Sequence, residues 1–431
     1  MIDNGAVAAL DDRVIGPHHK GLPREAWGQT ARDYLRTEPT LDRWSTPLLT
    51  VDRAALESNL SVMADWARAA GVSLAPHGKT TMAPQVWARQ LDAGAWGLTL
   101  ATPWQVQLAR SFGVGRIMLA NAIVDPTALA WLAAELDADP SFEFFSWADS
   151  VQTVELMDRR LASTPHGRPV NVMVELGQSG GRTGARSIES ARAVAEAIHR
   201  SARLALAGVG GYEGALSHDR ESTGLTAVRN YLDRLGRLHQ NIAAEGLYAA
   251  DAIVTAGGSA YQDVVVEALA SLADEQPSGV RTSVVVRSGA YVIHDDGFYA
   301  GISPLIPGRA ERPLRSAMHG WARTVSRPEP ELALLDAGKR DLPFDEGLPV
   351  PQRIVGADAG VLDKAEVTAL NDQHAFLRLP GVHADDVPVG TVVRLGLSHP
   401  CTAFDKWRLI PVVDDADAAN PRIVDLIHTF F

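Results

Sequence analysis

The sequence predicts a (β/α)8 TIM barrel followed by a C-terminal, mostly antiparallel β domain. Between residues 72 and 286, eight short apolar runs alternate with amphipathic or Ala-rich stretches, which is the pattern of a parallel barrel. Beyond residue 303, prolines, glycines and short Val/Leu runs replace the helical periods, which is typical of an antiparallel domain. We therefore expect an N-terminal extension at 1–45 that associates with the β domain, a barrel at 46–303, and the β domain at 304–431.

Each barrel strand is expected at one of the apolar runs, most of which are continuous because strands of a parallel barrel are buried on both faces. The expected strands are Val72–Ala75, Trp96–Ala101, Arg116–Ala120, Phe142–Trp147, Val170–Glu175, Leu204–Val209, Ala252–Thr255 and Ser283–Val286. The alternative is an open doubly wound sheet, which would carry a Gly-x-Gly-x-x-Gly turn after its first strand. That spacing is absent here.

Other segments carry local signals of their own. Thr46–Asp52 is a strand candidate, and Asp52 is suited to cap a helix over Arg53–Ala70. Leu56, Leu60, Met63 and Ala67 share one face of that helix. Helices are also expected at Pro103–Phe112 and Ile188–Arg200. In the β domain, strands are expected at Leu332–Leu335, Arg353–Val355, Ala375–Leu379, Val392–Leu397 and Leu409–Val413.

Composition limits the classes of partner. The 431 residues are 46% hydrophobic and 21% charged, with a net charge of -12 and no block of Lys and Arg, so a nucleic-acid partner is not expected. No apolar run is long enough to span a bilayer, and the first residues lack the apolar core of a signal peptide. One cysteine cannot form an internal disulfide. These features favour a cytoplasmic globular protein without a membrane partner.

Lys79 lies in the segment VSLAPHGKT, where a buried strand ends in a turn marked by Pro76 and Gly78. The carboxyl ends of barrel strands carry the site, so His77 and Lys79 are candidate site residues. Burial favours the neutral amine of a lysine, which is the form that attacks a carbonyl. This is what holding pyridoxal phosphate (PLP) as a Schiff base requires, although most lysines after strands are solvated loop residues.

Later strands also end in polar or glycine-rich segments. These are Gly177–Gly184 with Arg182, Gly210–Gly214 with Tyr212, Thr255–Ser259, and Arg287–Tyr291. The turn Gly257-Gly258-Ser259 offers backbone N–H groups and a hydroxyl, which are the donors that a phosphate needs. Late loops are also where barrel phosphate sites fall. The alternative interpretation is that these glycines serve tight turns only.

His399 and Cys401 form a second candidate site in Ser398-His-Pro-Cys-Thr402. Alternate residues of an extended segment point the same way, so an imidazole and a thiolate could face one ion. Nitrogen and sulfur ligands suit zinc, and two protein ligands leave positions open for water or substrate. The alternative is an inert buried cysteine beside a histidine that serves the structure.

A family resemblance connects these motifs. It rests on TPLLTVDRAALESN, APHGKT, GAWGLTLATPWQ, IMLAN, VELGQSGGRTG, GGYEG, TAGGS, SGAYV and LSHPCTAFDKW, in this order. With these motifs the chain resembles, over most of its length, the D-serine dehydratase and D-threonine aldolase group of the alanine racemase-like, fold-type III PLP enzymes. The resemblance implies a PLP barrel, a β domain whose residues close the site, and a homodimer with sites near the subunit interface.

Residue roles follow from the resemblance. It implies that Lys79 is the Schiff-base lysine, and that His399 and Cys401 bind the metal. Cofactor contacts are expected from His77, Arg182, Tyr212, Gly257, Gly258, Ser259 and Tyr291. Of these, Gly257, Gly258 and Ser259 are implied to hold the phosphate, and the residue that meets the pyridine nitrogen is left open. Tyr261 and Gln262 depart from the Thr or Pro that the family often has there, and the N-terminal extension has no assigned role.

The resemblance implies loss of the β-hydroxyl from a D-3-hydroxy amino acid, which gives a keto acid and ammonia. Lys79 would take the Cα proton, and zinc would stabilise the departing oxygen. The nearest alternative is an aldolase that releases glycine and an aldehyde; His-Pro-Cys in place of His-x-Asp favours elimination, and manganese is the alternative ion. A racemase would lack the metal pair, and a PLP-binding protein without activity would lack the β domain. D-serine, D-threonine and 3-hydroxy-D-aspartate all fit as substrates.

Overall fold

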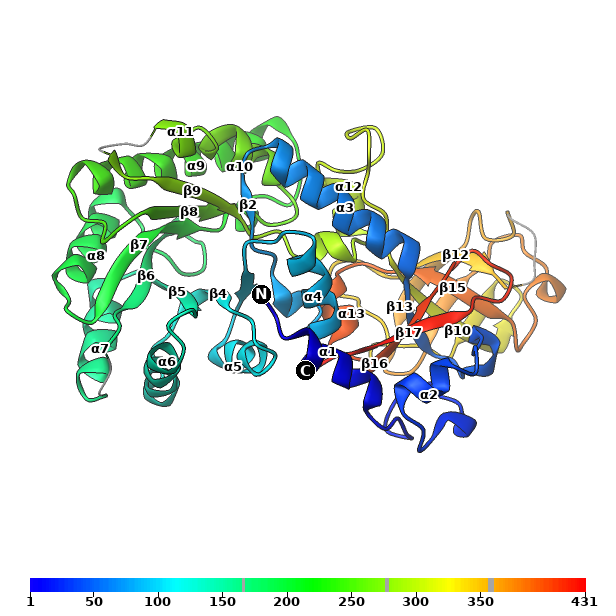
Figure 1. Cartoon of the computed structure of the whole chain (residues 1–431). Coiled ribbons are helices and arrows are strands. Elements are labelled where there is room, and N and C mark those ends of the chain that lie inside the picture. Colours follow the sequence, from blue (N-terminus) through cyan, green and yellow to red (C-terminus); the bar gives the residue numbers. More distant parts are fainter. Residues whose placement is uncertain (165–166, 276–278, 356–359) are drawn as a thin grey trace. The chain divides into compact units, whose positions relative to one another are not determined.

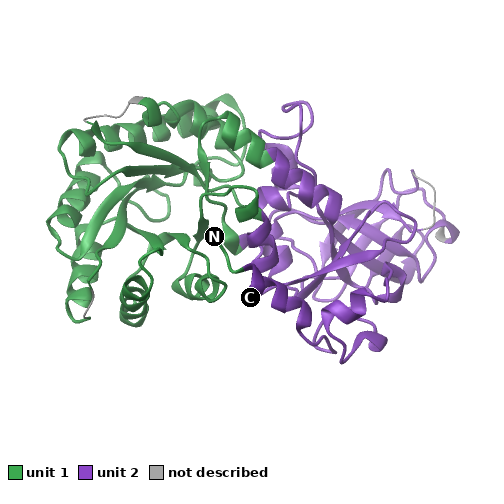
Figure 2. Cartoon of the chain, viewed as in Figure 1, with its two compact units in different colours: residues 1–3, 63–79, 90–289 green, residues 4–62, 80–89, 290–431 purple. Residues whose placement is uncertain are grey.

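The computed structural model describes residues 1–164, 167–275, 279–355 and 360–431. The chain forms two compact units (Figure 2), of which unit 1 comprises Met1–Asp3, Met63–Lys79 and Gln90–Gly289. Unit 2 comprises Asn4–Val62, Thr80–Arg89 and Ala290–Phe431. These units differ from the expected boundaries at 46 and 304, because residues before 63 and a short segment after Lys79 belong with the C-terminal part of the chain.

Unit 1 is built on a sheet of eight parallel strands in the order β2-β9-β8-β7-β6-β5-β4-β3 (Figure 1). The strands are β2 Ser73–Leu74, β3 Leu98–Leu100, β4 Arg116–Ala122, β5 Glu143–Ala148, β6 Val170–Leu176, β7 Leu204–Gly211, β8 Ala252–Ala256 and β9 Thr282–Val286. Each strand lies at one of the eight predicted apolar runs. The predicted fold class, a TIM-like parallel sheet with a separate β domain, is confirmed.

The first and last strands of this sheet meet through an irregular segment. The N–H of Trp96 donates to the carbonyl of Leu74 at 2.7 Å, and the N–H of Thr99 donates to that of Pro76 at 2.9 Å. Pro76 has no N–H, so a regular ladder cannot continue through it. Inside the curled sheet, six of the eight strands and the residue after β2 contribute to one apolar cluster: Ala75, Met118, Phe145, Trp147, Met173, Ala207, Ile253 and Val285.

Helices lie along the outside of the curled sheet (Figure 1). Four of them start at a side chain that accepts a hydrogen bond from a first-turn N–H, namely Thr102, Asp125, Ser150 and Ser187. The helices are α5 Pro103–Ser111, α6 Pro126–Ala138, α7 Val151–Ala162, α8 Ile188–Arg200, α9 Ser222–Ala244, α10 Gln262–Leu269 and α11 Leu272–Glu275.

Two helices run from one unit into the other, α3 Arg53–Ala69 and α4 Pro84–Asp92. The prediction for α3 is confirmed at its start, because Asp52 Oδ1 accepts a hydrogen bond from the N–H of Ala55 at 2.7 Å. Its predicted apolar face is also buried. No helix of the described residues is long and apolar enough to cross a membrane.

Unit 2 contains a nine-stranded sheet whose pairs are antiparallel except that of β1 with β16. Its main path runs β13-β14-β11-β10-β1-β16-β17, and β15 joins β10 to β12. The strands are β1 Leu48–Asp52, β10 Met318–Glu329, β11 Leu332–Leu335, β12 Val350–Ile354, β13 Glu366–Leu370, β14 Ala375–Arg378, β15 Val392–Gly396, β16 Leu409–Val413 and β17 Ile423–His428. Short helices α12 Phe298–Ile302 and α13 Pro400–Phe404 complete it.

Three features of this sheet differ from the sequence-based expectation. β1 pairs with β10 and β16, so the Thr46–Asp52 segment belongs to the β sheet and not to the barrel. β10 and β13 were not predicted, because arginines, serine and exposed polar residues interrupt their apolar pattern. The C-terminal segment forms strand β17, which was not predicted. Pairing between residues distant in sequence decides all three.

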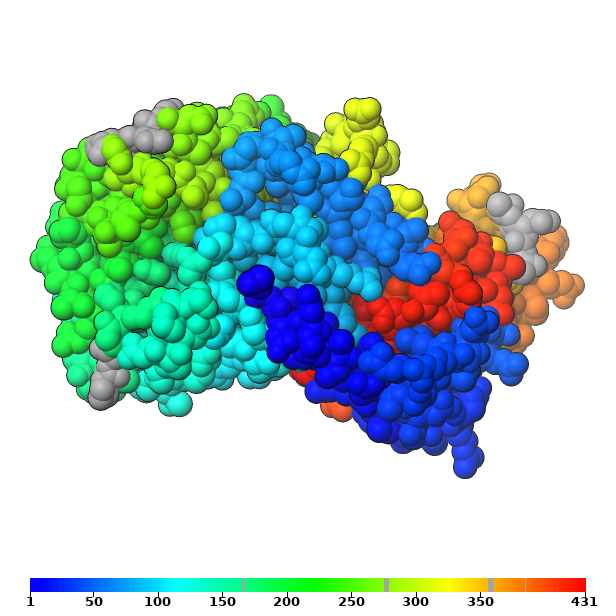
Figure 3. Space-filling model, viewed as in Figure 1, coloured from blue at the N-terminus to red at the C-terminus, as the bar shows by residue number. Residues whose placement is uncertain are grey.

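The N-terminal extension packs on the sheet of unit 2. Its helices α1 Asn4–Ala8 and α2 Ala31–Leu35 are short. The buried cluster on this face comprises Ile15, Leu22, Ala26, Ala31, Tyr34, Leu41, Trp44, Leu48, Trp321, Leu409, Val413, Ala416, Ile423 and Leu426. The N–H of Ile423 also donates to the carbonyl of Pro39 at 2.8 Å. In Figure 3 the dark blue N-terminal segment lies beside the red C-terminal segment accordingly.

Candidate functional site

Lys79 lies in a 3-10 turn at Gly78–Thr80, after β2, and its side chain is half-buried. Nearby, Nδ1 of His77 is buried and has no hydrogen-bond partner among the described residues. Burial, together with the positive charges of Lys79, Arg287 and Arg182, holds the pKa of His77 well below its usual value. The imidazole is therefore neutral. The structure brings these predicted residues together at the carboxyl ends of the barrel strands.

Arg287, directly after β9, is a further candidate site residue, which sequence reasoning did not single out. Its side chain is buried, and its guanidinium donates to Thr255 Oγ1 at 2.6 Å and to the carbonyl of Gly211 at 2.5 Å. Its Nε is buried without a hydrogen-bond partner in the part of the chain that the structure describes. The ring of Trp147 lies 5.5 Å from the guanidinium carbon. The available signal was an arginine ending an apolar run at a strand end.

The Gly257–Gly258 turn does not offer its N–H groups to a ligand. Both N–H groups donate to the carboxylate of Glu213, each at 2.9 Å, and Glu213 is fully buried. Gly257 has φ +96°, a conformation that favours glycine. In the described chain, the N–H groups of the next residues, Ser259 and Ala260, make no hydrogen bond to protein. Open donors therefore follow the predicted glycines.

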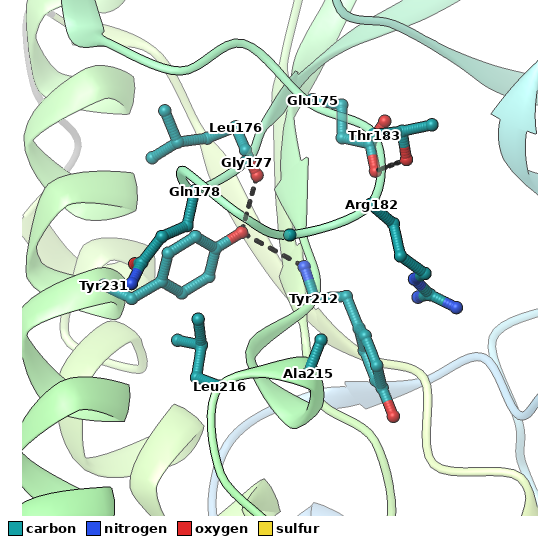
Figure 4. Close-up of a pocket in the computed structure, with 11 residues that line it drawn as sticks. Glu175, Leu176, Gly177, Gln178, Arg182, Thr183, Tyr212, Ala215, Leu216 and Tyr231 are labelled. Atoms are coloured by element: carbon teal, nitrogen blue, oxygen red, sulfur yellow. Dashed lines mark hydrogen bonds between the residues drawn. The ribbon is translucent and has the colours of Figure 1, made fainter.

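A small pocket lies beside this turn and contains two of the predicted residues, Arg182 and Tyr212 (Figure 4). The guanidinium carbon of Arg182 lies 4.8 Å from the centre of the Tyr212 ring. Tyr231 closes the inner side, since its hydroxyl donates to the carbonyl of Leu176 at 2.6 Å and accepts from the N–H of Tyr212 at 3.1 Å. A Cβ on Gly211 would stand 1.8 Å from that hydroxyl, so only glycine fits there.

Glu175 adds a carboxylate to the same pocket. Burial raises its pKa, against a hydrogen bond from Thr183 Oγ1 at 2.9 Å that lowers it. The pocket is lined by Glu175, Leu176, Gly177, Gln178, Gly181, Arg182, Thr183, Tyr212, Ala215, Leu216 and Tyr231. Three of these side chains, of Glu175, Thr183 and Arg182, lie along one side of the loop in Figure 4.

Three predicted residues belong to unit 2. Tyr291 is buried in a 3-10 turn at Ala290–Val292. The side chains of His399 and Cys401 lie close enough to interact, since Cys401 helps to raise the pKa of His399. They meet in another way than we expected, because the segment is not extended: His399 has φ +52° and ψ +82°, and Cys401 lies in helix α13. The left-handed conformation of His399, followed by a helical turn, brings its side chain close to that of Cys401. An extended strand would have placed the two side chains on the same side as well.

His399 is held at its ring and at its backbone. Its Nδ1 lies 2.6 Å from Asp345 Oδ2, and its N–H donates to Asp295 Oδ2 at 3.1 Å. Burial lowers the pKa of His399, but the hydrogen bond and charge of Cys401 and the charge of Asp345 outweigh it and raise the pKa to about 9. Cys401 Sγ lies 3.6 Å from Thr80 Oγ1. No group of three or more His, Cys, Asp or Glu residues arranged for a metal ion occurs among the described residues.

Two family models match separate segments of the chain. The model described as "Alanine racemase, N-terminal domain" matches residues 51–263, and that described as "Putative serine dehydratase domain" matches residues 317–413. A curated relative, D-threonine aldolase from Arthrobacter sp, is 28% identical over 377 residues, which are 87% of this chain and 90% of the relative.

Solved structures share the fold. D-threonine aldolase from Filomicrobium marinum has a TM-score of 0.73 at 22% identity, covering 90% of this chain and 96% of its own. D-threo-3-hydroxyaspartate dehydratase from Delftia sp. HT23 has a TM-score of 0.68 at 20% identity, covering 91% of this chain and 99% of its own. The chain is thus similar to D-threonine aldolase along most of its length, and its two matched segments correspond to an alanine racemase N-terminal domain and a putative serine dehydratase domain.

Proposed function

We propose that this protein is a PLP- and zinc-dependent lyase that removes the β-hydroxyl of a D-3-hydroxy amino acid, as a D-serine dehydratase does, to give a keto acid and ammonia. The observation that carries the proposal is the closeness of the His399 side chain to that of Cys401, the chain's single cysteine, which helps to raise the pKa of His399. The similarity of this chain to D-threonine aldolase supports a D-3-hydroxy amino acid as substrate.

The residues of unit 1 fit PLP. Two buried nitrogens, His77 Nδ1 and Arg287 Nε, lack protein partners in the described chain and suit the polar atoms of a bound ring. We propose that Lys79 holds the cofactor by its amine, while the N–H groups of Ser259 and Ala260 and the Ser259 hydroxyl take the phosphate. When bound, PLP supplies an electron sink for the carbanion at Cα.

The catalytic base in this proposal is Lys79. With PLP and substrate bound, the amine of Lys79 would be the group that accepts the Cα proton. His77 is less suited to this role, since burial and the charges of Arg287 and Arg182 oppose its protonation. Arg182 and Tyr212 line the same region and would orient the substrate and cofactor.

The donor set of unit 2 fits zinc. The closeness of the His399 imidazole and the Cys401 thiol supports a site for one ion, and zinc takes nitrogen and sulfur ligands. We propose that these two residues hold the ion, with the remaining positions left for water and substrate. When bound, zinc supplies Lewis acidity toward a hydroxyl oxygen that must leave.

The alternative function is aldol cleavage of D-3-hydroxy amino acids. Both an aldolase and a dehydratase are among the similar proteins. The metal pair favours elimination. Solved structures of D-threo-3-hydroxyaspartate dehydratase include a histidine-to-alanine mutant and, in the metal-free form, a cysteine-to-alanine mutant. In its sequence the histidine stands two residues before the cysteine, as His399 stands before Cys401 here. The same His-x-Cys spacing in a dehydratase supports our choice.

Product analysis tests the proposal. Purified protein with PLP and zinc is incubated with D-serine, D-threonine or 3-hydroxy-D-aspartate, and the keto acid and ammonia are assayed alongside glycine and aldehyde. We expect keto acid and ammonia in equal amounts. Release of glycine and aldehyde instead would replace the dehydratase by the aldolase. We also propose that the protein is cytoplasmic and forms a homodimer. Light scattering on the purified protein would check the homodimer by its mass.

A further inference from the structure

We propose that Asp345 is a positioning residue for His399: it fixes the imidazole through Nδ1 and so reserves Nε2 for the metal ion. The inference rests on the proposed function, because it takes His399 and Cys401 as the metal pair. All the residues that carry it lie in unit 2.

The first step is the tautomer of His399. Its Nδ1 lies 2.6 Å from Asp345 Oδ2, the short distance of a charge-assisted hydrogen bond. An ionised carboxylate only accepts hydrogen bonds, so Nδ1 must carry the hydrogen. In the neutral ring, Nε2 then carries the lone pair that a metal ion requires. Metal-binding histidines commonly donate their second N–H to a carboxylate in this way.

The second step is that Asp345 is itself held in place. Its other oxygen, Oδ1, accepts a hydrogen bond from Thr402 Oγ1 at 2.7 Å. The N–H of Thr402 donates to the carbonyl of His399 at 3.2 Å, and Thr402 Oγ1 lies 3.3 Å from the same carbonyl. His399, Asp345 and Thr402 therefore form a closed ring of hydrogen bonds, which restricts rotation of both the carboxylate and the imidazole.

The third step separates the ring from the backbone. The unusual φ of +52° at His399 is supported by Asp295, whose Oδ2 accepts the His399 N–H at 3.1 Å. Its Oδ1 accepts from the N–H groups of Gly297, Tyr299 and Ala300 at 3.1, 2.8 and 3.2 Å. Asp295 thus fixes the backbone, whereas Asp345 fixes the ring, and loss of Asp345 should release only the ring.

The test measures zinc affinity of the full-length protein by competition with a chromophoric chelator. Because the Asp345 side chain is 41% exposed, Asp345→Ala should fold, which thermal unfolding checks. We expect zinc to bind about 10- to 100-fold more weakly in Asp345→Ala. Asp345→Asn keeps an acceptor oxygen and should restore part of the affinity. The matched control is Asp405→Asn, a carboxylate that is 42% exposed and pairs with Lys406, which should bind zinc as the unmodified protein does.

Cobalt substitution adds a readout that a general structural effect would not give. The thiolate-to-cobalt absorption should persist in Asp345→Ala at saturating cobalt, because Cys401 still binds. Unchanged zinc affinity in a folded Asp345→Ala would overturn the inference while leaving the proposed function standing. A changed coordination spectrum in Asp345→Asn would also overturn it, since Asp345 would then be a ligand. If the unmodified protein binds neither zinc nor cobalt, the proposed function fails and the inference falls with it.

Discussion

The carboxylate of Glu213 accepts a hydrogen bond from the backbone N–H of Gly257 at 2.9 Å, and a second from the N–H of the next residue at the same distance. This contact joins the segment after β7 to the segment after β8, inside unit 1. Two N–H groups that looked suited to phosphate are therefore already paired, and the turn is held before any ligand arrives. Glu213 was not among the residues predicted for the site.

Replacement of Glu213 by glutamine should weaken PLP binding. A glutamine amide can accept from only one side, so one buried N–H loses its partner at a cost of about 1–3 kcal/mol. We expect PLP affinity to fall by about tenfold or more, because about 1.4 kcal/mol is tenfold. Pyridoxal lacks the phosphate, so its affinity should change little. Fluorescence titration of both compounds checks this, with exposed Glu221→Gln as control. Tighter PLP binding in Glu213→Gln would mean that the carboxylate competes with the phosphate.

Lys79→Ala should abolish turnover and the visible absorption of the PLP-loaded protein. The reason is that the proposal gives its amine both the cofactor link and the Cα proton. Spectra and product assays on the purified variant check the expectation, and Lys339→Ala, an exposed lysine of unit 2, is the control. A variant at position 79 that retains spectrum and activity would return Lys79 to an ordinary loop lysine.

Cys401→Ala should lose activity while PLP stays bound, and a chelator should have the same effect on the unmodified protein. The proposal places the metal at His399 and Cys401, apart from the residues that hold PLP. Zinc should restore the chelated protein best, since a thiolate prefers zinc to harder ions. Cys401→Asp should shift the preference toward manganese and raise aldol cleavage relative to elimination. Full activity after exhaustive chelation, with metal analysis showing none bound, would refute the metal assignment.

Trp44→Ala should destabilise unit 2 by about 3–5 kcal/mol, the range for a large aromatic side chain removed from a core. Trp44 is 3% exposed in the cluster that the N-terminal extension forms with the sheet, and its Nε1 donates to the Tyr34 hydroxyl at 3.0 Å. Trp27 of the same extension is 44% exposed, so Trp27→Ala should cost far less. Denaturant unfolding of both variants measures the difference. Equal effects would show that the extension does not share a core with the sheet.

Mild acid should destabilise the protein in part through His428. Burial, then the charges of Arg13 and His19, lowers its pKa to about 4 in the folded state. An unfolded histidine has a pKa of about 6.5, so between these pH values the unfolded chain binds more protons than the folded chain. The free energy of unfolding therefore decreases as the pH is lowered. The maximum slope is about 1.4 kcal/mol per pH unit for one such group.

His428→Gln should therefore lose about 2 kcal/mol less stability than the unmodified protein when the pH falls from about 7 to about 5. Denaturant unfolding at the two pH values measures this difference. His374→Gln, at an exposed position of unit 2, is the control and should keep the full pH dependence. An identical pH dependence in His428→Gln would show that this imidazole titrates normally in the folded protein.

Local patterns were enough to predict much of the fold. The eight apolar runs of unit 1 and the cap at Asp52 are properties of neighbouring residues, and burial on both faces makes such strands readable. Two strands of the β domain, β11 and β16, have the predicted bounds. Strand β1 illustrates the limit: its apolar pattern identifies a strand, but the choice of β10 and β16 as partners depends on residues more than 250 positions away.

The candidate site shows the same division. The sequence by itself determined the residue types at the strand ends, including Lys79, the glycine turn and the pair His399 and Cys401, because these choices are local. Only the tertiary structure decided that Glu213 takes the N–H groups of that turn, that Arg287 lies buried with a free nitrogen among the described residues, and that Asp345 meets His399. Contacts of this kind join side chains from separate loops, and no periodicity along the chain records which loops will meet.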